Sequence, residues 1–169
     1  VVLCLGAAIN DLAALTGIRV PLIPKRGYHA HYAPDPERGL AHPVVDVEQG
    51  YVVAPMQAGW RLTTGAQLLG RGEAPNPVQI ARAERHARQL FALGERREPQ
   101  VWTGVRPCTA DMLPLIGPVK AKPGLWFATG HGHQGLTLAA ITGDLLADAL
   151  TGGTPALPLA PYSPDRFAA

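Results

Sequence analysis

The chain has 169 residues, of which 47% are hydrophobic and 17% charged, and a formal net charge of +2. This length suits one domain or a little more, and the composition is too apolar for a disordered segment. Fifteen Lys/Arg against thirteen Asp/Glu create no strong basic field, which argues against DNA or RNA as a partner. Two cysteines, Cys4 and Cys108, are too few for a disulfide scaffold and suit a reducing compartment.

The chain opens with a short apolar run, Val1 to Leu5, which ends at Gly6 and predicts a buried strand. It begins on valine and carries no signal-peptide pattern, so we expect a piece of a longer protein. Residues 123–143 contain no Asp, Glu, Lys or Arg, over about the length of a membrane span. Because glycine, histidine and glutamine interrupt this stretch, we interpret it as a buried element of a soluble domain.

The first half of the chain predicts mainly strands. Asn10 or Asp11 is a candidate N-cap for a brief helix that Gly17 would end. Prolines and a glycine interrupt the strand character of the following segment, so we expect an edge or bent strand there. The next two strand candidates are separated by four residues and predict a hairpin. In chain order these elements are a helix at 12–15, a strand within 19–32 and strands at 50–55 and 60–66.

The second half begins with a stronger helix signal. Asn76 is a candidate N-cap, and Pro77 would occupy the first helical position. Apolar residues then recur at helical spacing to position 91, while three arginines form a solvated basic side. Strands are expected at 100–107, 113–117 and 125–129, followed by an apolar helix at 136–150. Mixed strands with three helices and a hairpin indicate an α+β domain.

Residues 130–135 read Gly-His-Gly-His-Gln-Gly, the G-x-G-x-x-G form, between a predicted strand and a predicted helix. A complete dinucleotide fingerprint also needs a second parallel strand after the helix, and the Pro-rich tail beyond Leu150 offers none. We therefore expect no complete βαβ unit here. A glycine loop before a helix still exposes amide N–H groups to an anion or a partly negative oxygen. The alternative is a tight turn that needs glycine for a positive φ.

Arg106 stands near the end of an otherwise uncharged strand, where a guanidinium can clamp a carboxylate through two parallel hydrogen bonds. The alternative is a structural salt bridge, for instance to Asp111. Tyr51 could donate its hydroxyl to the same ligand, although such a tyrosine can equally be half-buried.

The sequence gives little support for a zinc site or for a serine hydrolase. The pairs His29/His31 and His131/His133 lack a carboxylate or cysteine ligand at a familiar interval, which disfavours zinc. Ser163 is the only serine and no Gly-x-Ser-x-Gly occurs, which excludes a serine hydrolase in practice.

Several motifs together point to a known family. Residues 101–107 read Val-Trp-Thr-Gly-Val-Arg-Pro, and residues 125–132 read Leu-Trp-Phe-Ala-Thr-Gly-His-Gly. With Gly-Gly-Thr-Pro at 152–155 and Arg166-Phe167 in the tail, the chain resembles the FAD-dependent amino-acid oxidoreductases of the D-amino-acid oxidase family. The nearest branch is that of the bacterial D-amino-acid dehydrogenases, and the likeness covers nearly the whole chain.

The resemblance implies the C-terminal part of a two-domain α+β flavoprotein whose N-terminal half, with the true dinucleotide fingerprint, is missing. This part would contain an antiparallel or mixed substrate-domain sheet plus the last strand and helix of the FAD-binding domain. The implied boundaries are 1–18 for the FAD-binding domain, 19–107 for the substrate-binding domain, 108–152 for the return to the FAD-binding domain and 153–169 for the tail.

The resemblance also implies site residues. Arg106 would bind the amino-acid carboxylate, assisted by Tyr51 and close to His133. Backbone donors of residues 132–137 would face the N1/C2=O edge of the flavin, where negative charge develops as a hydride arrives. No catalytic side chain and no metal is implied. The residues implied to contact FAD are Gly6, Ala7, Gly130, His131, Gly132, Gln134, Gly135, Leu136 and Thr137.

The implied activity is oxidative deamination of an amino acid, above all a D-amino acid, by hydride transfer to FAD, which gives a 2-oxo acid and ammonia. His133, Gln134 and Leu136 depart from the family pattern, so the substrate side chain and the choice of oxygen or a membrane quinone as electron acceptor stay open. The rival hypothesis is a non-catalytic binding module or accessory subunit that keeps the fold without flavin. We expect a cytoplasmic protein and leave open attachment to the periphery of a bacterial inner membrane.

Overall fold

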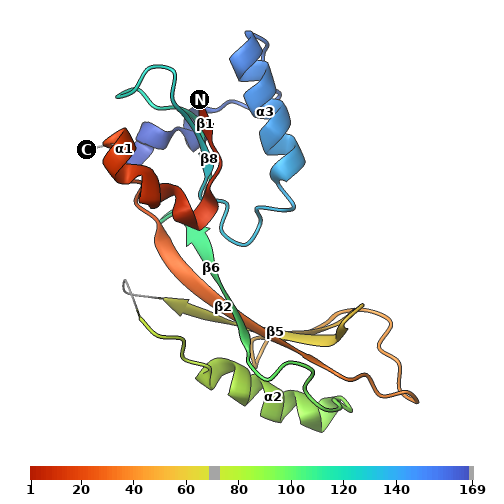
Figure 1. The fold of residues 1–169 in the computed structure, drawn as a ribbon. Helices are drawn as coiled ribbons and strands as arrows, with labels where there is room; N and C mark the ends of the chain where they lie inside the picture. The colour runs from red at the N-terminus through yellow and green to blue at the C-terminus, as the bar shows by residue number, and fades with distance from the viewer. Residues whose placement is uncertain (69–72, 168–169) are drawn as a thin grey trace. The chain divides into compact units, whose positions relative to one another are not determined.

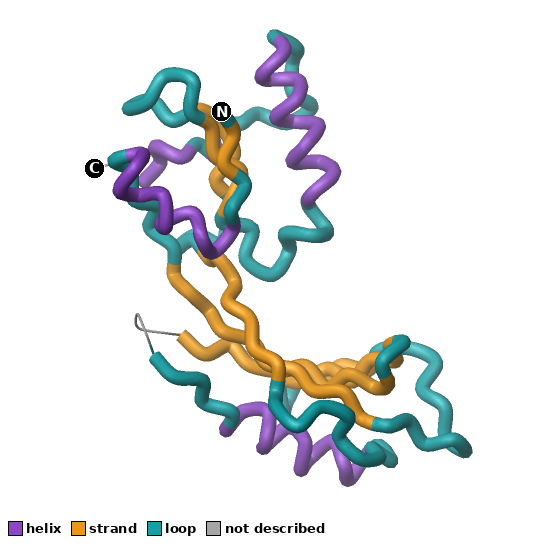
Figure 2. The backbone as a smooth tube through the Cα atoms, in the orientation of Figure 1, coloured by secondary structure: helices purple, strands orange, loops and turns teal. Residues whose placement is uncertain are grey.

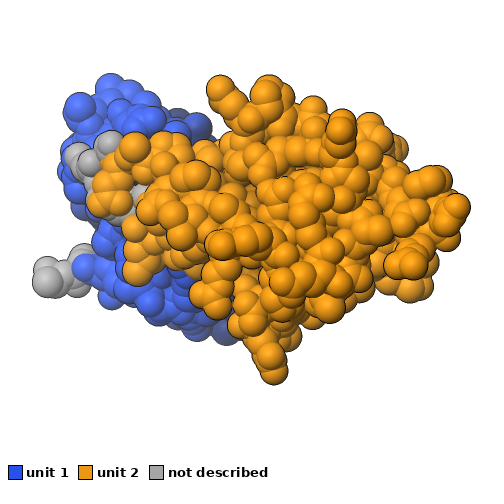
Figure 3. Space-filling model, turned by 90° about the horizontal axis from the view of Figure 1, so that it is seen from below, with its two compact units in different colours: residues 1–25, 106–169 blue, residues 26–105 orange. Residues whose placement is uncertain are grey.

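The computed structural model describes residues 1–68 and 73–167. The chain forms two compact units, coloured separately in Figure 3. Unit 1 contains Val1–Lys25 and Arg106–Ala169, and unit 2 contains Arg26–Val105. In the described part of the chain, no helix is both long and apolar enough to span a membrane.

Unit 1 is built around a small sheet of three strands in the order β1-β8-β7 (Figures 1 and 2). β1 and β8 run parallel, with Leu3 opposite Phe127, whereas β7 and β8 are antiparallel. The elements are β1 (Val2–Leu3), the 3-10 helix η1 (Gly6–Leu12), α1 (Ala13–Thr16), β7 (Leu115–Pro118), β8 (Trp126–Thr129), α3 (Ala139–Thr151) and the 3-10 turns η2 (Ala160–Tyr162) and η3 (Pro164–Phe167).

Both faces of β7 and β8 in unit 1 are packed. Leu115 and Phe127 contribute to one core cluster with Ile9 of η1. Ile116 and Ala128 contribute to a second cluster with Leu146 of α3. This two-sided burial explains why these strands read as nearly continuous apolar runs in the sequence.

Unit 2 contains most of a five-stranded sheet in the order β3-β4-β5-β2-β6, and α2 lies along one face of it (Figure 1). β3, β4 and β5 form an antiparallel meander. The elements are β2 (Ile23–Tyr32), β3 (Val44–Asp46), β4 (Tyr51–Met56), β5 (Gly59–Leu68), α2 (Val78–Leu90) and β6 (Trp102–Cys108).

The two faces of this sheet differ in burial. Tyr28, Tyr32 and Leu62 are almost completely buried in the core that includes Ile80 and Ala83 of α2. Because side chains alternate along a strand, the residues between them, such as Arg61, belong to the opposite face. On β4 and β5 these intervening residues are half-buried.

Three expectations about the elements need correction. Asn10 does not cap a helix, because its side chain exchanges hydrogen bonds of 2.9 and 2.8 Å with the backbone of Val20. The segment expected to be an edge or bent strand is β2, and the edge alternative is wrong because β2 lies inside the sheet between β5 and β6. α3 begins at Ala139, three residues later than predicted, because residues 135–138 form turns.

Other expectations are confirmed. Gly17 ends α1 in the left-handed conformation. The hairpin of β4 and β5 is present, although its loop is shorter than expected because Met56 still pairs with Gly59. The helix expected after Asn76 is present as α2, but its N-cap is Pro77 and its first residue is Val78, so the predicted cap is wrong by one residue. The side-chain oxygen of Asn76, one residue before the cap, accepts a hydrogen bond of 3.2 Å from the amide of Val78.

Candidate functional site

Unit 1 contains a cavity of about 440 Å³ beyond the carboxyl ends of the parallel strands β1 and β8. Open sheets with parallel strands bind their ligands at this end, and the volume is within the range of small-molecule sites. The lining residues come from the segments after both strands, from the end of β6 and from α3. They are Cys4, Gly6, Pro107, Ala128, His131, Gly132, Gly135, Ala139, Thr142, Gly143 and Leu146.

The glycine loop after β8 turns sharply, and two of its glycines are required for that turn. Gly130 has φ +78° and Gly132 has φ +57°. A Cβ at Gly130 would also lie 2.9 Å from Thr109 Cγ2. Gly135 has no such backbone requirement, but it lines the cavity and leaves that wall without a side chain. The tight-turn interpretation is therefore correct for the first two glycines.

The same loop and the turns after it contain backbone amide groups that donate no hydrogen bond to any described residue. The N–H of Gly132 donates to Pro107 O and that of Gln134 to His131 O, each at 2.9 Å. By contrast, the N–H groups of four residues in the turns before α3 have no acceptor among the residues that the structure describes. These residues are His133, Gly135, Leu136 and Thr137. Unpaired amides near a helix start favour a negatively charged or partly negative oxygen.

His131 connects this loop to α3. Its Nε2 lies 3.1 Å from Thr142 Oγ1, and both residues line the cavity. Burial lowers the pKa of His131 below its ordinary 6.5, so the ring is neutral at pH 7. The wall of the cavity is therefore uncharged at this point.

The end of β1 is fastened to the end of β8. Gly6 has φ +52°, and its carbonyl accepts a hydrogen bond of 3.1 Å from Thr129 Oγ1. Of the residues predicted to contact the cofactor, Gly6, His131, Gly132 and Gly135 line the cavity. The other predicted contacts, Ala7, Gly130, Gln134, Leu136 and Thr137, do not line it, and Leu136 is 94% exposed.

The two predicted substrate residues of unit 1, His133 and Arg106, are not among the residues that line the cavity. His133 is exposed, and its Nε2 accepts a hydrogen bond of 3.2 Å from the side-chain amide of Gln134. Arg106 is half-buried on β6 and does not line the cavity, although the next residue, Pro107, does. Successive side chains of a strand point to opposite faces.

A salt bridge from Arg106 to Asp111, the example given for a structural role of Arg106, does not form. Arg166 forms that ion pair instead, with Nε and Nη2 at 2.8 and 3.0 Å from the two carboxylate oxygens. These hydrogen bonds hold the pKa of Asp111 far below its ordinary value. The ion pair fastens the C-terminal tail to the loop after β6.

Tyr51 is buried within unit 2, with 2% of its surface exposed. Its hydroxyl lies 3.1 Å from Nδ1 of His86 on α2. Burial and the neighbouring Asp46 carboxylate raise the pKa of Tyr51 to about 12, so the hydroxyl stays protonated at neutral pH. The role of Tyr51 in substrate binding stays a prediction.

Comparison with known families identifies the group to which the chain is related. A family model described as "FAD dependent oxidoreductase" matches residues 1–149. The chain belongs to this family of FAD-dependent oxidoreductases.

Several relatives in this family have names that refer to the oxidation or dehydrogenation of amino acids. It is 35% identical to a D-amino-acid oxidase of Bradyrhizobium diazoefficiens and 34% identical to a D-amino acid dehydrogenase of Paramagnetospirillum magneticum. Each comparison covers 98% of this chain and 40% of the relative. The structure of a glycine oxidase from Geobacillus kaustophilus matches 97% of this chain and 44% of that one, with a TM-score of 0.73 and 28% identity. The chain thus spans about 40% of the length of these curated relatives.

The cavity fits part of the cofactor that gives this family its name. Its glycine-lined wall admits a flat group, and Gly135 in that wall has an unpaired amide that suits an oxygen that becomes more negative. The pattern G-x-G-x-x-G revealed the loop but not Cys4 or Thr142, which also line the cavity. Thr142 is buried in α3 together with Leu145 and Leu146, and a polar residue on the buried side of a helix is the signal that could have indicated a polar partner.

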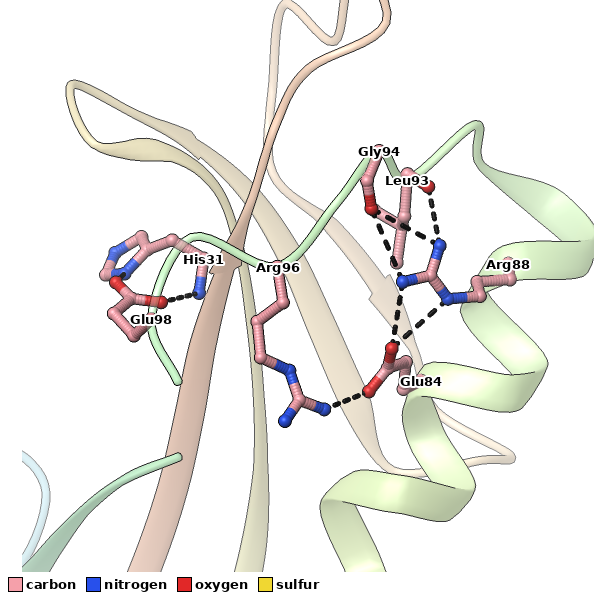
Figure 4. A network of polar contacts seen from close by, with 7 residues as sticks. All are labelled: His31, Glu84, Arg88, Leu93, Gly94, Arg96 and Glu98. Atoms are coloured by element: carbon pink, nitrogen blue, oxygen red, sulfur yellow. Dashed lines mark hydrogen bonds and ion pairs between the residues drawn. The ribbon is translucent and has the colours of Figure 1, made fainter. Parts of the chain in front are cut away.

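Unit 2 holds polar side-chain networks that the sequence motifs did not reveal (Figure 4). Glu84 of α2 pairs with Arg88 at 2.9 Å and also with Arg96 from the segment after the helix. Arg88 Nη1 in addition donates to the carbonyl of Leu93 at 2.6 Å. This network fastens the end of α2 to the connection that leads towards β6.

Proposed function

We propose that this chain is the C-terminal part of a flavoenzyme that oxidatively deaminates an amino acid, above all a D-amino acid, to a 2-oxo acid and ammonia. The observation that carries the proposal is the cavity beyond β1 and β8, whose glycine-lined wall includes the unpaired amide of Gly135. The names of the relatives support the substrate class, because two of them are an oxidase and a dehydrogenase of D-amino acids.

In this proposal the cavity residues hold the flavin end of FAD. When bound, FAD accepts the hydride that leaves the substrate Cα, together with its electron pair. The amides of residues 133 and 135–137 donate hydrogen bonds to an oxygen that becomes more negative during the reaction. The hydrogen bond between His131 and Thr142 keeps the loop against α3, so these donors are oriented before the reaction begins.

Arg106 binds the substrate carboxylate in this proposal. A guanidinium matches a carboxylate with two parallel hydrogen bonds, which fixes the orientation of the amino acid as well as its position. We assign residues 19–107 to substrate binding, and 1–18 with 108–152 to cofactor binding.

The experiment is to purify the full-length protein that carries this chain and to add D- and L-amino acids without oxygen. The proposal predicts that D-amino acids bleach the flavin absorbance and that one ammonia forms for each 2-oxo acid. Reoxidation by oxygen or by a soluble quinone then identifies the electron acceptor. Bleaching by L-amino acids alone would overturn the stereochemistry. A protein that stays colourless with added FAD would support the rival, a binding module that has kept the fold.

A further inference from the structure

The end of β6 and the turn after it pack against the glycine loop of the unit 1 cavity. The N–H of Gly132 donates to Pro107 O at 2.9 Å. A Cβ built on Gly132 would lie 3.6 Å from Met112 Cε, and one built on Gly130 would lie 2.9 Å from Thr109 Cγ2. Because these glycines have no side chain, the backbone of the loop lies close to the turn. A movement of the turn would therefore change the shape of the loop that lines the cavity.

The turn, residues 109–114, has a backbone conformation that its sequence does not favour. Among the residues that the structure describes, Met112 is the only non-glycine residue with a positive φ, at +61°. Such a conformation persists only where the surrounding contacts determine it. Within the turn, Thr109 Oγ1 donates to Leu113 O at 2.7 Å, and the N–H of Leu113 donates to Asp111 Oδ1 at 3.1 Å. The turn thus depends on contacts that fix the Asp111 side chain and the Leu113 carbonyl.

Arg166 of η3 supplies these contacts with every N–H of its guanidinium. Nε and Nη2 donate to the two carboxylate oxygens of Asp111 at 2.8 and 3.0 Å. Nη2 also donates to Leu113 O at 2.6 Å, and Nη1 donates to Pro114 O and Ser163 O at 3.1 and 3.2 Å. A guanidinium has five N–H donors in one rigid plane, so it fixes its acceptors relative to one another. The Arg166 side chain is only 15% exposed, which limits competition from water.

The segment that carries Arg166 is anchored in the core of unit 1. Phe167 packs against the buried cluster that contains Leu115 of β7 and Phe127 of β8. The guanidinium carbon of Arg166 lies 4.5 Å from the centroid of the Phe167 ring. A continuous series of contacts therefore leads from this core through Arg166 to the 109–114 turn, and from the turn to the glycine loop.

We propose that Arg166 is a positioning residue for the cofactor, because it holds the 109–114 turn and, through the turn, the glycine loop in the shape that binds FAD. This inference rests on the proposed function, since it takes the cavity as the flavin site. Four of the five hydrogen bonds of Arg166 go to residues 111–114, so the side chain fixes this turn more than its own segment. A loop that is ordered in advance loses less conformational freedom when it binds a ligand.

The main test measures the Kd of FAD by flavin fluorescence, with full-length protein from which the flavin has been removed. Arg166→Ala should raise this Kd by about 10-fold, because FAD must then order the loop as it binds. Asp111→Asn breaks the same contact from the other side and should have a similar effect. The double variant should bind FAD little more weakly than either single variant. Arg166→Lys keeps the charge without the five donors and should lie between wild type and Arg166→Ala.

Two further variants separate positioning from general stability. Lys122→Ala is the matched control, because Lys122 is an exposed basic residue of the same unit, and it should leave the Kd unchanged. Phe167→Ala weakens the packing of the tail but removes none of the hydrogen bonds of the Arg166 guanidinium. For the same loss in free energy of unfolding, Arg166→Ala should raise the Kd more than Phe167→Ala. It should also shift the absorption maxima of the bound flavin at saturating FAD. An unchanged Kd in Arg166→Ala, or equal increases in both variants at equal stability, would overturn the inference.

A measurement without cofactor separates this inference from the proposed function. Hydrogen exchange of the flavin-free protein is followed in peptides from residues 130–137, with peptides from α2 as the internal reference. Arg166→Ala should speed exchange in residues 130–137 and leave α2 unchanged. This result would support the positioning role even if no amino acid bleached the flavin. Unchanged exchange in residues 130–137 would count against the role, even in an enzyme that deaminates amino acids.

Discussion

Unit 1 and unit 2 present their polar groups in different ways. In unit 1, the cavity beyond β1 and β8 is lined largely by small and apolar residues, and the groups suited to a ligand are main-chain amides. In unit 2, the half-exposed sheet face presents side chains, with Arg61, His31 and Glu98 in one hydrogen-bonded chain. A site made of main-chain groups depends on backbone geometry, whereas a site made of side chains depends on residue identity.

This difference has a consequence for specificity. Main-chain donors suit the cofactor, which is the same for every substrate, because they cannot be changed without changing the turn. Side chains on a rigid sheet can change one at a time and so adapt the protein to one substrate. We therefore expect unit 1 to support the common chemistry of the family and unit 2 to select the substrate.

The largest effect is expected from Arg106, the one charged side chain proposed to act in the common chemistry. Arg106→Ala should cost about 2–5 kcal/mol in apparent substrate binding, because a bidentate pair to a carboxylate is lost. Steady-state kinetics of the full-length protein should show KM raised by about 30-fold or more for all amino acids alike. Arg85→Ala is the control, because Arg85 is exposed on α2. Unchanged saturation by substrate would remove Arg106 from the site and leave unit 1 with main-chain recognition alone.

A substitution at Gly130 tests whether the conformation of the glycine loop requires glycine at this position. Gly130→Ala should lower the free energy of unfolding by about 2–4 kcal/mol, since it combines a left-handed conformation with a close contact to Thr109. Gly124→Ala is a matched control, because Gly124 has φ +85° but open space around its Cα. It should cost only about 1–2 kcal/mol. Equal losses in urea unfolding would show that packing against Thr109 contributes nothing.

The two regions also differ in how far the sequence predicted them. The glycine loop, β8 and the hairpin of β4 and β5 depend on neighbouring residues, so local patterns were sufficient. The pairs Asp111–Arg166 and His31–Glu98 join residues that are 55 and 67 positions apart, and no local pattern connects them. Asn10 was misjudged for the same reason, because its partner Val20 belongs to a later segment.

Glu84 tests how much the side-chain networks of unit 2 contribute to its stability. Burial raises the pKa of Glu84, but hydrogen bonds from Arg88, Tyr32 and Arg96 outweigh it, so the pKa lies below the ordinary 4.5. A depressed carboxyl pKa stabilises the fold above the ordinary carboxyl range, and this contribution is lost as the pH falls through the depressed value. Glu84→Gln should therefore cost about 1–3 kcal/mol at pH 7.

The measurement is urea unfolding of both proteins from pH 7 downward. The difference between wild type and Glu84→Gln should shrink as the pH falls below the ordinary carboxyl range, because protonation removes the same charge in the wild type. Glu37→Gln serves as the control, since Glu37 is exposed and outside the network. A difference that stays constant with pH would mean that the network stabilises unit 2 by packing and not by charge.

The smallest effect is expected from Tyr51, where a substitution shows whether a buried polar group of unit 2 serves stability or substrate binding. If the polar groups buried under α2 serve the fold and those on the other face serve the substrate, Tyr51→Phe should affect stability alone. Loss of the hydrogen bond to His86 should cost about 0.5–1.5 kcal/mol in urea unfolding. KM for the amino acid should not change, because the hydroxyl already has a partner within unit 2. A raised KM with unchanged stability would instead support the substrate contact predicted from the sequence, and both sides of the sheet would then take part in recognition.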